Sequence, residues 1–138
     1  MSHYYTDGSA NPNPGPGGYA VILDGAPVAL GREKNSTNIR MEAHALIAAY
    51  KIAQPGDKIS TDSEFWVNVV TKWAPTWKAN GWTKKTGPIK NLELVQELYE
   101  LFVSKPDVNL KWTRGHVGTE GNELADEWAN KARQGAEL

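Results

Sequence analysis

The order of strand-like and helix-like segments constrains the fold of this chain more than any other feature of the sequence. Three strand-like stretches come first, and strand and helix patterns alternate after them, in the order β-β-β-α-β-α-α-β-α. Strand runs followed by such alternation predict an α/β domain with one mixed sheet flanked by helices. The length of 138 residues suits a single domain over residues 1–138. The strand-like stretches are residues 2–6, 19–23, 27–31, 58–61 and 108–113.

The predicted helices follow from apolar residues at helical spacing and from the residues at their ends. Residues 41–52 are apolar nearly all round, which is typical of a buried helix, and Ser36-Thr37-Asn38 before them offers N-caps. Ser63 and Asn91 are expected to cap two more helices, and Pro75 to kink or restart the first of these. The apolar face of the last helix consists of Leu124, Ala125, Trp128, Ala129 and Ala132.

The amino-acid composition limits where in the cell the protein is expected and which metal sites it can contain. The chain has no cysteine, which excludes disulfides and cysteine-ligated zinc. No apolar run approaches the roughly 20 residues that a membrane-spanning helix needs, and the first residues lack the basic and apolar segments of a secretion signal. We therefore expect a cytoplasmic protein without membrane association, and we expect it to act as a monomer.

One segment concentrates positive charge and tryptophan. The net charge is −1, yet residues 65–92 contain five lysines, four of the six tryptophans and neither Asp nor Glu. The rest of the chain carries ten basic against sixteen acidic residues, a net charge of −6. We call residues 72–90, which hold all five lysines, the basic segment, and it is a candidate nucleic-acid contact. The alternative is a packed helix with solvated lysines, and Trp66 and Trp73 are expected in the core.

Two predicted strands end in similar short sequences, and each supplies an aspartate. Thr6-Asp7-Gly8 lies at the end of the first strand, and Thr61-Asp62-Ser63 lies at the end of the fourth. Functional sites in α/β sheets form beyond the carboxyl ends of strands. Asp7 and Asp62 therefore come together if the two strands are parallel neighbours, and the connection through the helix at residues 41–52 permits this pairing.

Two further acids lie on predicted helices, and each of the four carboxylates also has a simple structural explanation. Glu42 is the one acid in the apolar part of its helix, in the predicted first turn, where the helix dipole favours an anion. Asp126 lies beside the apolar stripe of the last helix and could be a surface charge. Asp7 before a glycine could be a turn residue, and Asp62 could belong to a helix cap.

Divalent-metal chemistry gives the four carboxylates one common explanation. Carboxylates that converge without a cation repel each other, and their pKa values rise. Mg²⁺ prefers oxygen ligands and combines a few carboxylates with waters and substrate phosphate oxygens. Two such ions about 4 Å apart can stabilise both the attacking and the leaving oxygen of phosphodiester hydrolysis. A two-metal phosphodiesterase site is therefore the hypothesis that uses all four acids.

Four sequence blocks carry a family resemblance. They are Thr6-Asp7-Gly8-Ser9 with Asn13-Pro14-Gly15-Pro16-Gly17-Gly18, then Thr37-Asn38-Ile39-Arg40-Met41-Glu42, then Thr61-Asp62-Ser63, and last Gly115-His116-Val117-Gly118 with Asn122-Glu123-Leu124-Ala125-Asp126. In this order and spacing the chain resembles type 1 ribonuclease H, the ribonuclease HI family, over nearly its whole length. A lone Thr-Asp-Gly is a weak signal, whereas four blocks in order are a strong one.

The resemblance implies a fold, an activity and a metal site. The fold is the ribonuclease H-like fold, a five-stranded mixed sheet flanked by helices, and the activity is endonucleolytic cleavage of the RNA strand of RNA–DNA hybrids. Two Mg²⁺ ions, which Mn²⁺ could replace, would be held by Asp7, Glu42, Asp62 and Asp126, with Asp7 between them. His116 would assist proton transfer or product release, although a solvated loop imidazole is the simpler interpretation of this residue.

The resemblance also implies contacts with the hybrid. Asn13, Thr37 and Asn38 match positions that contact the hybrid backbone in relatives, and the basic segment resembles the protruding handle of bacterial members. From that segment the expected contacts are Trp77, Lys78, Trp82, Lys84 and Lys85. Ile39 departs from the family pattern, because many relatives have a second asparagine there that reaches the minor groove.

Two other functions remain open from the sequence. The first is another two-metal nuclease or polynucleotidyl transferase on the same fold. The second is a catalytically silent module that binds hybrids. The set of four acids argues against the second, because a binding module gains nothing from negative charge that converges beside a phosphate.

Overall fold

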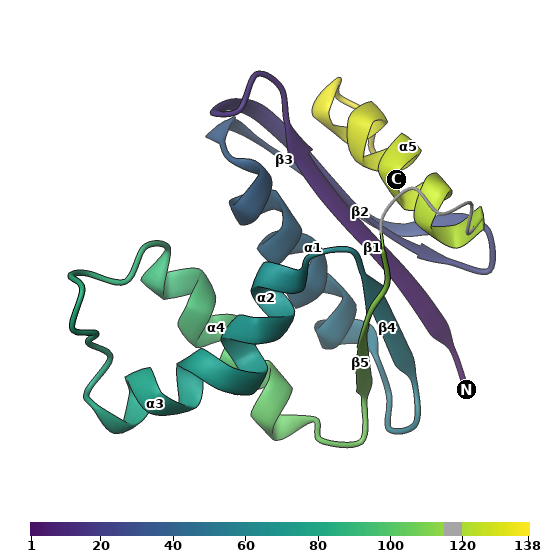
Figure 1. The fold of residues 1–138 in the computed structure, drawn as a ribbon. Helices are drawn as coiled ribbons and strands as arrows, with labels where there is room; N and C mark the ends of the chain where they lie inside the picture. The colour runs from purple at the N-terminus through teal and green to yellow at the C-terminus, as the bar shows by residue number, and fades with distance from the viewer. Residues whose placement is uncertain (115–119) are drawn as a thin grey trace.

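The sheet has five strands in the order β3-β2-β1-β4-β5, and the pairing is antiparallel among β1, β2 and β3 and parallel from β1 through β4 to β5 (Figure 1). The structure is a computed structural model, and it describes residues 1–114 and 120–138. The predicted mixed sheet is confirmed. The strands are β1 (His3–Ala10), β2 (Gly15–Leu23), β3 (Ala26–Ser36), β4 (Lys58–Thr61) and β5 (Asn109–Trp112).

Helices cover both faces of the sheet. Alternate residues of β2 enter two different clusters: Val21 packs with α1, whereas Ala20 and Ile22 pack with α5. The larger cluster also contains residues of α4 and of the helical stretch after β4, and Figure 1 shows α1 and α5 on opposite sides of the sheet. The helical segments are α1 (Asn38–Ile52), α2 (Glu64–Asn68), η1 (Val69–Trp73), α3 (Ala74–Ala79), α4 (Leu92–Ser104) and α5 (Glu120–Arg133).

A glycine brings the first helix close to the central strand. A Cβ atom on Gly8 of β1 would overlap the backbone of Met41 and Glu42 in α1. Any larger residue at position 8 would therefore push the helix and the strand apart. The close approach brings the backbone of Glu42 against β1 one residue beyond Asp7.

The first three strands are longer than predicted, and this changes the setting of Asp7. The run of proline and glycine is a turn only at residues 11–14, because β1 extends to Ala10 and β2 begins at Gly15. Asp7 therefore lies inside β1, where it pairs with Ala20 of β2. On its other side, the pairing of β1 with β4 ends at Thr6 and Thr61.

Helix α1 begins three residues before the predicted start. Thr37 is its N-cap, and the Thr37 Oγ1 accepts a hydrogen bond from the Arg40 backbone N–H at 3.1 Å. The first turn consequently contains no acid, and Glu42 lies beyond it. The helix dipole therefore does not explain Glu42, because its effect falls off within the first turn.

The other predicted caps have different outcomes. Ser63 caps α2 as expected, and its Oγ accepts from the Trp66 backbone N–H. Asn91 occupies the N-cap position of α4, but it has a left-handed backbone (φ 57°) and makes no side-chain cap hydrogen bond. Its side chain is instead hydrogen-bonded to Arg40.

A π-helical turn, η1, interrupts the helical stretch after β4. Trp66 is fully buried as expected, but Trp73 is 39% exposed, so the prediction of a core position for Trp73 is wrong. The wider winding of a π-turn shifts the residues that follow around the helix axis. Ala74 takes the buried position instead, and Pro75 lies in the first turn of α3, where a missing N–H is tolerated.

The edge strand β5 is less buried than its alternating sequence predicts. Val108, just before it, is buried and Leu110 is half-buried, but Trp112 is 40% exposed at the open end of the strand. As for membrane insertion, none of the helices in the described part of the chain combines the length and the hydropathy that a crossing requires.

Candidate active site

The candidate active site lies where β4 stops pairing with β1. Asp7 and Asp62 each follow the last paired residues of these parallel strands, Thr6 and Thr61. The predicted parallel neighbours are thus confirmed. Asp7 is buried, with 8% of its surface exposed, and Asp62 is half-buried at the start of the turn to α2.

The surroundings of Asp7 disfavour its charged form. Burial raises the pKa of the Asp7 carboxyl, and repulsion from Asp62 together with a hydrogen bond and repulsion from Asp126 raises that pKa further. The backbone N–H of Gly8 opposes this, but the pKa stays far above the ordinary aspartate value. These influences show that carboxylates from β1, from the end of β4 and from α5 act on one another.

Glu42 joins this group from α1. Burial raises the pKa of Glu42 to about 7, and repulsion from Asp62 contributes, while a hydrogen bond from the Ser63 side chain acts in the opposite direction. Glu42 is thus linked to Asp7 through Asp62, which repels both carboxylates. Ser63 was expected only as a helix cap, and its contact with Glu42 is an addition that the sequence does not reveal.

Helix α5 is held against the sheet at the point where it carries Asp126. A Cβ atom on Gly18 of β2 would overlap the backbone of Ala129 and Arg133, so the helix and the strand are in close contact there. One turn after Asp126, the Asn130 Oδ1 lies 3.5 Å from the Ser9 Oγ of β1. These contacts hold the half-buried Asp126 next to Asp7.

The carboxylates suit hard divalent cations. Among residues 1–114 and 120–138, no three His, Asp or Glu side chains form a compact metal-binding group. Mg²⁺, however, is usually bound by one or two protein carboxylates together with waters and substrate oxygens. The interacting pairs Asp7–Asp126, Asp7–Asp62 and Glu42–Asp62 fit that requirement, and a cation would relieve the repulsion that raises the pKa values of Asp7 and Glu42.

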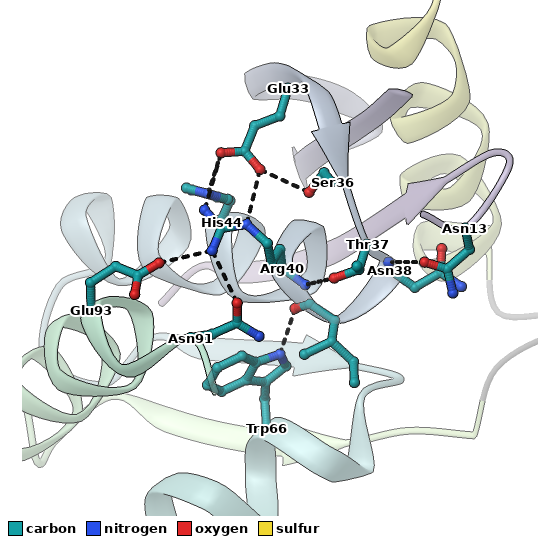
Figure 2. A network of polar contacts seen from close by, with 11 residues as sticks. Asn13, Glu33, Ser36, Thr37, Asn38, Arg40, His44, Trp66, Asn91 and Glu93 are labelled. Atoms are coloured by element: carbon teal, nitrogen blue, oxygen red, sulfur yellow. Dashed lines mark hydrogen bonds and ion pairs between the residues drawn. The ribbon is translucent and has the colours of Figure 1, made fainter. Parts of the chain in front are cut away.

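The three residues that were predicted to contact the backbone of the hybrid lie together at the start of α1 (Figure 2). The Asn38 backbone N–H donates to the Asn13 Oδ1 at 3.1 Å, and the Ala10 backbone N–H donates to the Asn38 Oδ1 at 2.7 Å. Thr37 is the cap of the same helix. The carboxamide oxygens of Asn13 and Asn38 therefore join the turn after β1 to α1, and both residues are exposed.

A groove of about 530 Å³ lies between the basic segment and the start of α1. Phe65 and Trp73 form an edge-to-face pair with ring centres 5.8 Å apart. The ring centre of Trp77 lies 6.2 Å from that of Trp73. Phe65 and Trp73 are about 40% exposed, and neither was expected in a binding surface. The residues that line the groove include the apolar Ile39, Phe65, Trp73 and Trp77 and the lysines Lys84, Lys85 and Lys90.

The remaining predicted contacts of the basic segment divide into two groups. Trp77, Lys84 and Lys85 line the groove, and the Lys84 Nζ lies 5.7 Å from the centre of the Trp77 ring. Lys78 and Trp82 lie against Tyr99 of α4 instead, with Trp82 edge-on at 6.2 Å and the Lys78 Nζ 5.9 Å from the ring centre.

The neighbourhood of Asp62 includes one more residue that the sequence did not indicate. The Trp112 Nε1–H donates to the backbone oxygen of Asp62 at 3.2 Å. Trp112 therefore helps to fix the turn that carries this carboxylate. His116, the predicted proton-transfer residue, lies outside the described residues.

Fold and site together define an α/β protein with an acidic site at the carboxyl ends of parallel strands. The family model described as RNase H matches residues 2–134. A Ribonuclease H of Methylorubrum extorquens is 43% identical over 137 residues, and one of Francisella philomiragia is 44% identical over 137 residues. The chain belongs to the ribonuclease H family of nucleases.

Coverage and structural similarity agree with this assignment. The alignment covers 96% of this chain and 60% of the Methylorubrum protein, and 93% of this chain and 88% of the Francisella protein. LC9-RNase H1, a type 1 RNase H with the type 2 active-site motif, has a TM-score of 0.82 and 29% identity, covering 99% of this chain and 73% of that one. The resemblance to type 1 ribonuclease H and the predicted fold are confirmed.

Proposed function

We propose that this ribonuclease H is an endonuclease that cleaves the RNA strand of RNA–DNA hybrids by a two-metal-ion mechanism. The observation that carries the proposal is the chain of mutual repulsions that links the Asp7, Glu42, Asp62 and Asp126 carboxylates near the end of the β1–β4 pairing, on four separate segments of the fold. A silent hybrid-binding module would not need four mutually repelling acids at one site.

The metal ions are proposed to be two Mg²⁺ ions, with Mn²⁺ as a substitute. Asp7 is the residue proposed to contact both, because it interacts with Asp62 and with Asp126. Glu42, Asp62 and Asp126 would supply the remaining protein ligands, and waters and substrate oxygens would complete the coordination. When bound, such ions supply stabilisation of the attacking and leaving oxygens in phosphodiester hydrolysis.

The chain's own polar groups are proposed to orient the RNA strand. The carboxamide oxygens of Asn13 and Asn38 accept hydrogen bonds within the fold, so their amide N–H groups are the donors suited to the sugar–phosphate backbone. Thr37 lies at the same helix start and is proposed as a third contact. His116 is proposed to move a proton at the reacting oxygens or to assist product release.

The groove is proposed to hold the DNA strand. Exposed aromatic rings such as Phe65, Trp73 and Trp77 can pack on sugars or bases without reading sequence. Lys84 and Lys85 can contact phosphates as point charges, which compensates for the negative charge of the rest of the chain. Lys78 and Trp82 are proposed as outlying contacts on the α4 side. The cytoplasmic location and the monomeric state stay predictions.

A cleavage assay tests the proposed function. A hybrid with an end-labelled RNA strand is incubated with the protein in Mg²⁺ or in EDTA, and the products are resolved on a denaturing gel. We expect internal cuts in the RNA strand in Mg²⁺ and none in EDTA. Binding of the hybrid without cuts in either Mg²⁺ or Mn²⁺ would support the silent-module alternative instead.

Replacing His116 with alanine should lower kcat and leave hybrid affinity nearly unchanged. A general acid or base typically contributes about 10²–10⁴-fold, and a proton carrier that water can partly replace should contribute about 100-fold or less. Steady-state kinetics on a hybrid measure both parameters. If KM rises while kcat holds, His116 contacts substrate and does not transfer the proton.

Replacing Lys84 and Lys85 with alanine should raise KM and reduce its salt dependence. Each lysine that neutralises one phosphate contributes about one unit to the log–log salt slope, so the slope should fall by about two units. The kcat at saturating hybrid should change little, because the carboxylates are untouched. A Lys51→Ala and Lys131→Ala double variant, at exposed lysines of α1 and α5, is the control that also removes two charges.

A triple variant decides whether Lys78 belongs to the same surface. If Lys78 contacts phosphate, adding Lys78→Ala to the double variant lowers the salt slope by about one further unit. A double variant with wild-type KM and wild-type slope would show that these lysines are only solvated surface.

A further inference from the structure

Arg40 joins three segments of the fold through one guanidinium group (Figure 2). Its Nε and Nη2 donate to the two carboxylate oxygens of Glu33 on β3, each at 3.3 Å. Its Nη1 donates to the Asn91 Oδ1 at 3.0 Å and to the Glu93 Oε1 of α4 at 2.8 Å. Arg40 itself lies on α1, two residues before Glu42, so it connects the active-site helix to β3 and to the start of α4.

The contact with Asn91 lies at the end of the basic segment. Asn91 follows Lys90 directly, has a left-handed backbone (φ 57°) and lines the groove together with Ile39 of α1. A left-handed backbone at a residue other than glycine is uncommon and needs support from its surroundings. The Arg40 hydrogen bond to the Asn91 side chain supplies such support, and it fixes where the chain leaves the groove and enters α4.

The positive charge of Arg40 is paired with carboxylates of the protein itself. Burial alone would raise the pKa of Glu33, but hydrogen bonds from Arg40 and Ser36 and the nearby His44 outweigh it and hold the pKa below its usual value. The Arg40 side chain is 26% exposed and forms ion pairs with the carboxylates of Glu33 and Glu93. A guanidinium committed to two carboxylates is poorly placed to neutralise a phosphate, so any effect on substrate acts through the groups that it holds.

The first turn of α1 is fixed on its other sides as well. The Trp66 Nε1–H donates to the Ile39 backbone oxygen at 2.7 Å, and Asn38 is bonded to Asn13 and Ala10. The turn therefore provides a rigid frame, and Arg40 is the side chain that extends from this frame to the junction of the basic segment with α4.

We propose that Arg40 is a positioning residue that sets the end of the basic segment, and with it the lysines that line the groove, against the active-site helix α1. The proposal rests on the proposed function, because it assumes that the groove holds one strand of the hybrid. Arg40 sets the distance between Lys84, Lys85 and the carboxylates without touching substrate.

Two variants of Arg40 give the expected kinetic signature. Arg40→Lys keeps a positive charge but cannot bridge Glu33 and Asn91 together, because lysine lacks the planar fork of donors. We expect Arg40→Lys to raise KM about threefold to tenfold and Arg40→Ala about tenfold or more, since small displacements of substrate-positioning groups have large effects. The kcat at saturating hybrid should stay within about threefold of wild type. If Arg40→Ala does not fold, Arg40→Lys carries the test.

A matched control exists on the same two helices. Lys51 of α1 and Glu97 of α4 form an ion pair with N–O distance 3.2 Å, away from the groove, and Lys51 is 60% exposed. Lys51→Met removes a connection between α1 and α4 but not the one at Asn91. We expect wild-type KM from Lys51→Met. An equal rise in KM from both variants would show that any loosening of α1 from α4 has the same effect, and it would overturn the positioning role.

A double-mutant cycle separates positioning from general destabilisation. If Arg40 acts through the lysines, Arg40→Lys should change KM by less than about twofold once Lys84 and Lys85 are alanines. Effects on KM that multiply in the combined variant would contradict the proposal. The Kd of the same four proteins for the hybrid is also measured in EDTA, which gives a second cycle based on binding alone. If the wild-type protein binds the hybrid but does not cut it in Mg²⁺ or Mn²⁺, the proposed function is refuted, while the Arg40 cycle on Kd still decides the positioning role.

Discussion

Asp7→Asn is expected to reduce hybrid cleavage by about three orders of magnitude or more while leaving the fold intact. Asp7 is the carboxylate that interacts with both Asp62 and Asp126, so neutralising it removes the ligand proposed to contact both ions. Asparagine has nearly the same shape, and the backbone of β1 is unchanged. Single-turnover cleavage at saturating hybrid and a thermal melt of the same sample measure the two properties. Asp107→Asn, at an exposed aspartate, should retain full activity.

The metal-free protein gives a second readout of the same substitution. A carboxyl whose pKa is raised in the folded state binds more protons when folded than when unfolded, so its contribution to stability is lost as the pH rises. In EDTA the wild-type melting temperature should therefore fall from about pH 4 through the raised pKa of Glu42, about 7, and further because the pKa of Asp7 is also raised. Asp7→Asn should flatten this decline, because the amide does not ionise.

At pH 8 in EDTA the Asp7→Asn variant should be at least as stable as wild type, because one repelling carboxylate is gone. Thermal melts between pH 5 and 9, with and without Mg²⁺, give the comparison, and Mg²⁺ should raise the wild-type melting temperature more than that of the variant. A clear drop in the metal-free melting temperature of Asp7→Asn at pH 8 would contradict the account of mutually repelling carboxylates.

A single 2′-deoxynucleotide in the RNA strand is expected to suppress cleavage at its own position. A protein that reads no base edges can still recognise the 2′-hydroxyl through hydrogen bonds and through the shape of the duplex. Removing a hydroxyl whose partners are buried with it costs about 1–3 kcal/mol, which corresponds to about tenfold to a hundredfold at that phosphodiester. Product lengths on a sequencing gel report the cuts nucleotide by nucleotide.

The matched control for this substrate is the same strand with the deoxynucleotide placed several positions away. Cleavage at the original position should then return to the all-RNA level, because only the hydroxyls near the reacting phosphate are recognised. Equal cleavage at the deoxynucleotide and at its all-RNA equivalent would favour a general two-metal nuclease.

The meeting of Asp7 and Asp62 could be predicted from the sequence because it depends on chain topology. Both aspartates follow Thr at the ends of strand patterns, and the chain between those strands passes through a helix, which permits parallel pairing. Glu42 was located in the correct helix but not in the correct turn. The start of α1 depends on which of three possible residues forms the cap, and Thr37 does so through a hydrogen bond that only the structure shows.

The groove could not be predicted in the same way. The spacing of Trp66, Val67, Val70 and Trp73 fits an α-helix, and the π-turn that exposes Trp73 leaves no signature in that spacing. Asn91 has the sequence of a helix cap, yet its side chain is bonded to Arg40, which is 51 residues away in the chain. At Asn91 local propensity is overridden by a contact that is distant in sequence, and both Trp73 and Asn91 line the groove.

Competition among three duplexes tests the central claim most directly. A hybrid, a DNA duplex and an RNA duplex of one sequence, each with its own label, are mixed in equal amounts with the protein in Mg²⁺, and the initial cleavage rate of each strand is measured. The proposed function predicts cuts in the RNA strand of the hybrid and at least a hundredfold lower rates on the other strands, as expected when the 2′-hydroxyl and the shape of the duplex are both recognised. Comparable cleavage of the DNA duplex or the RNA duplex would contradict it.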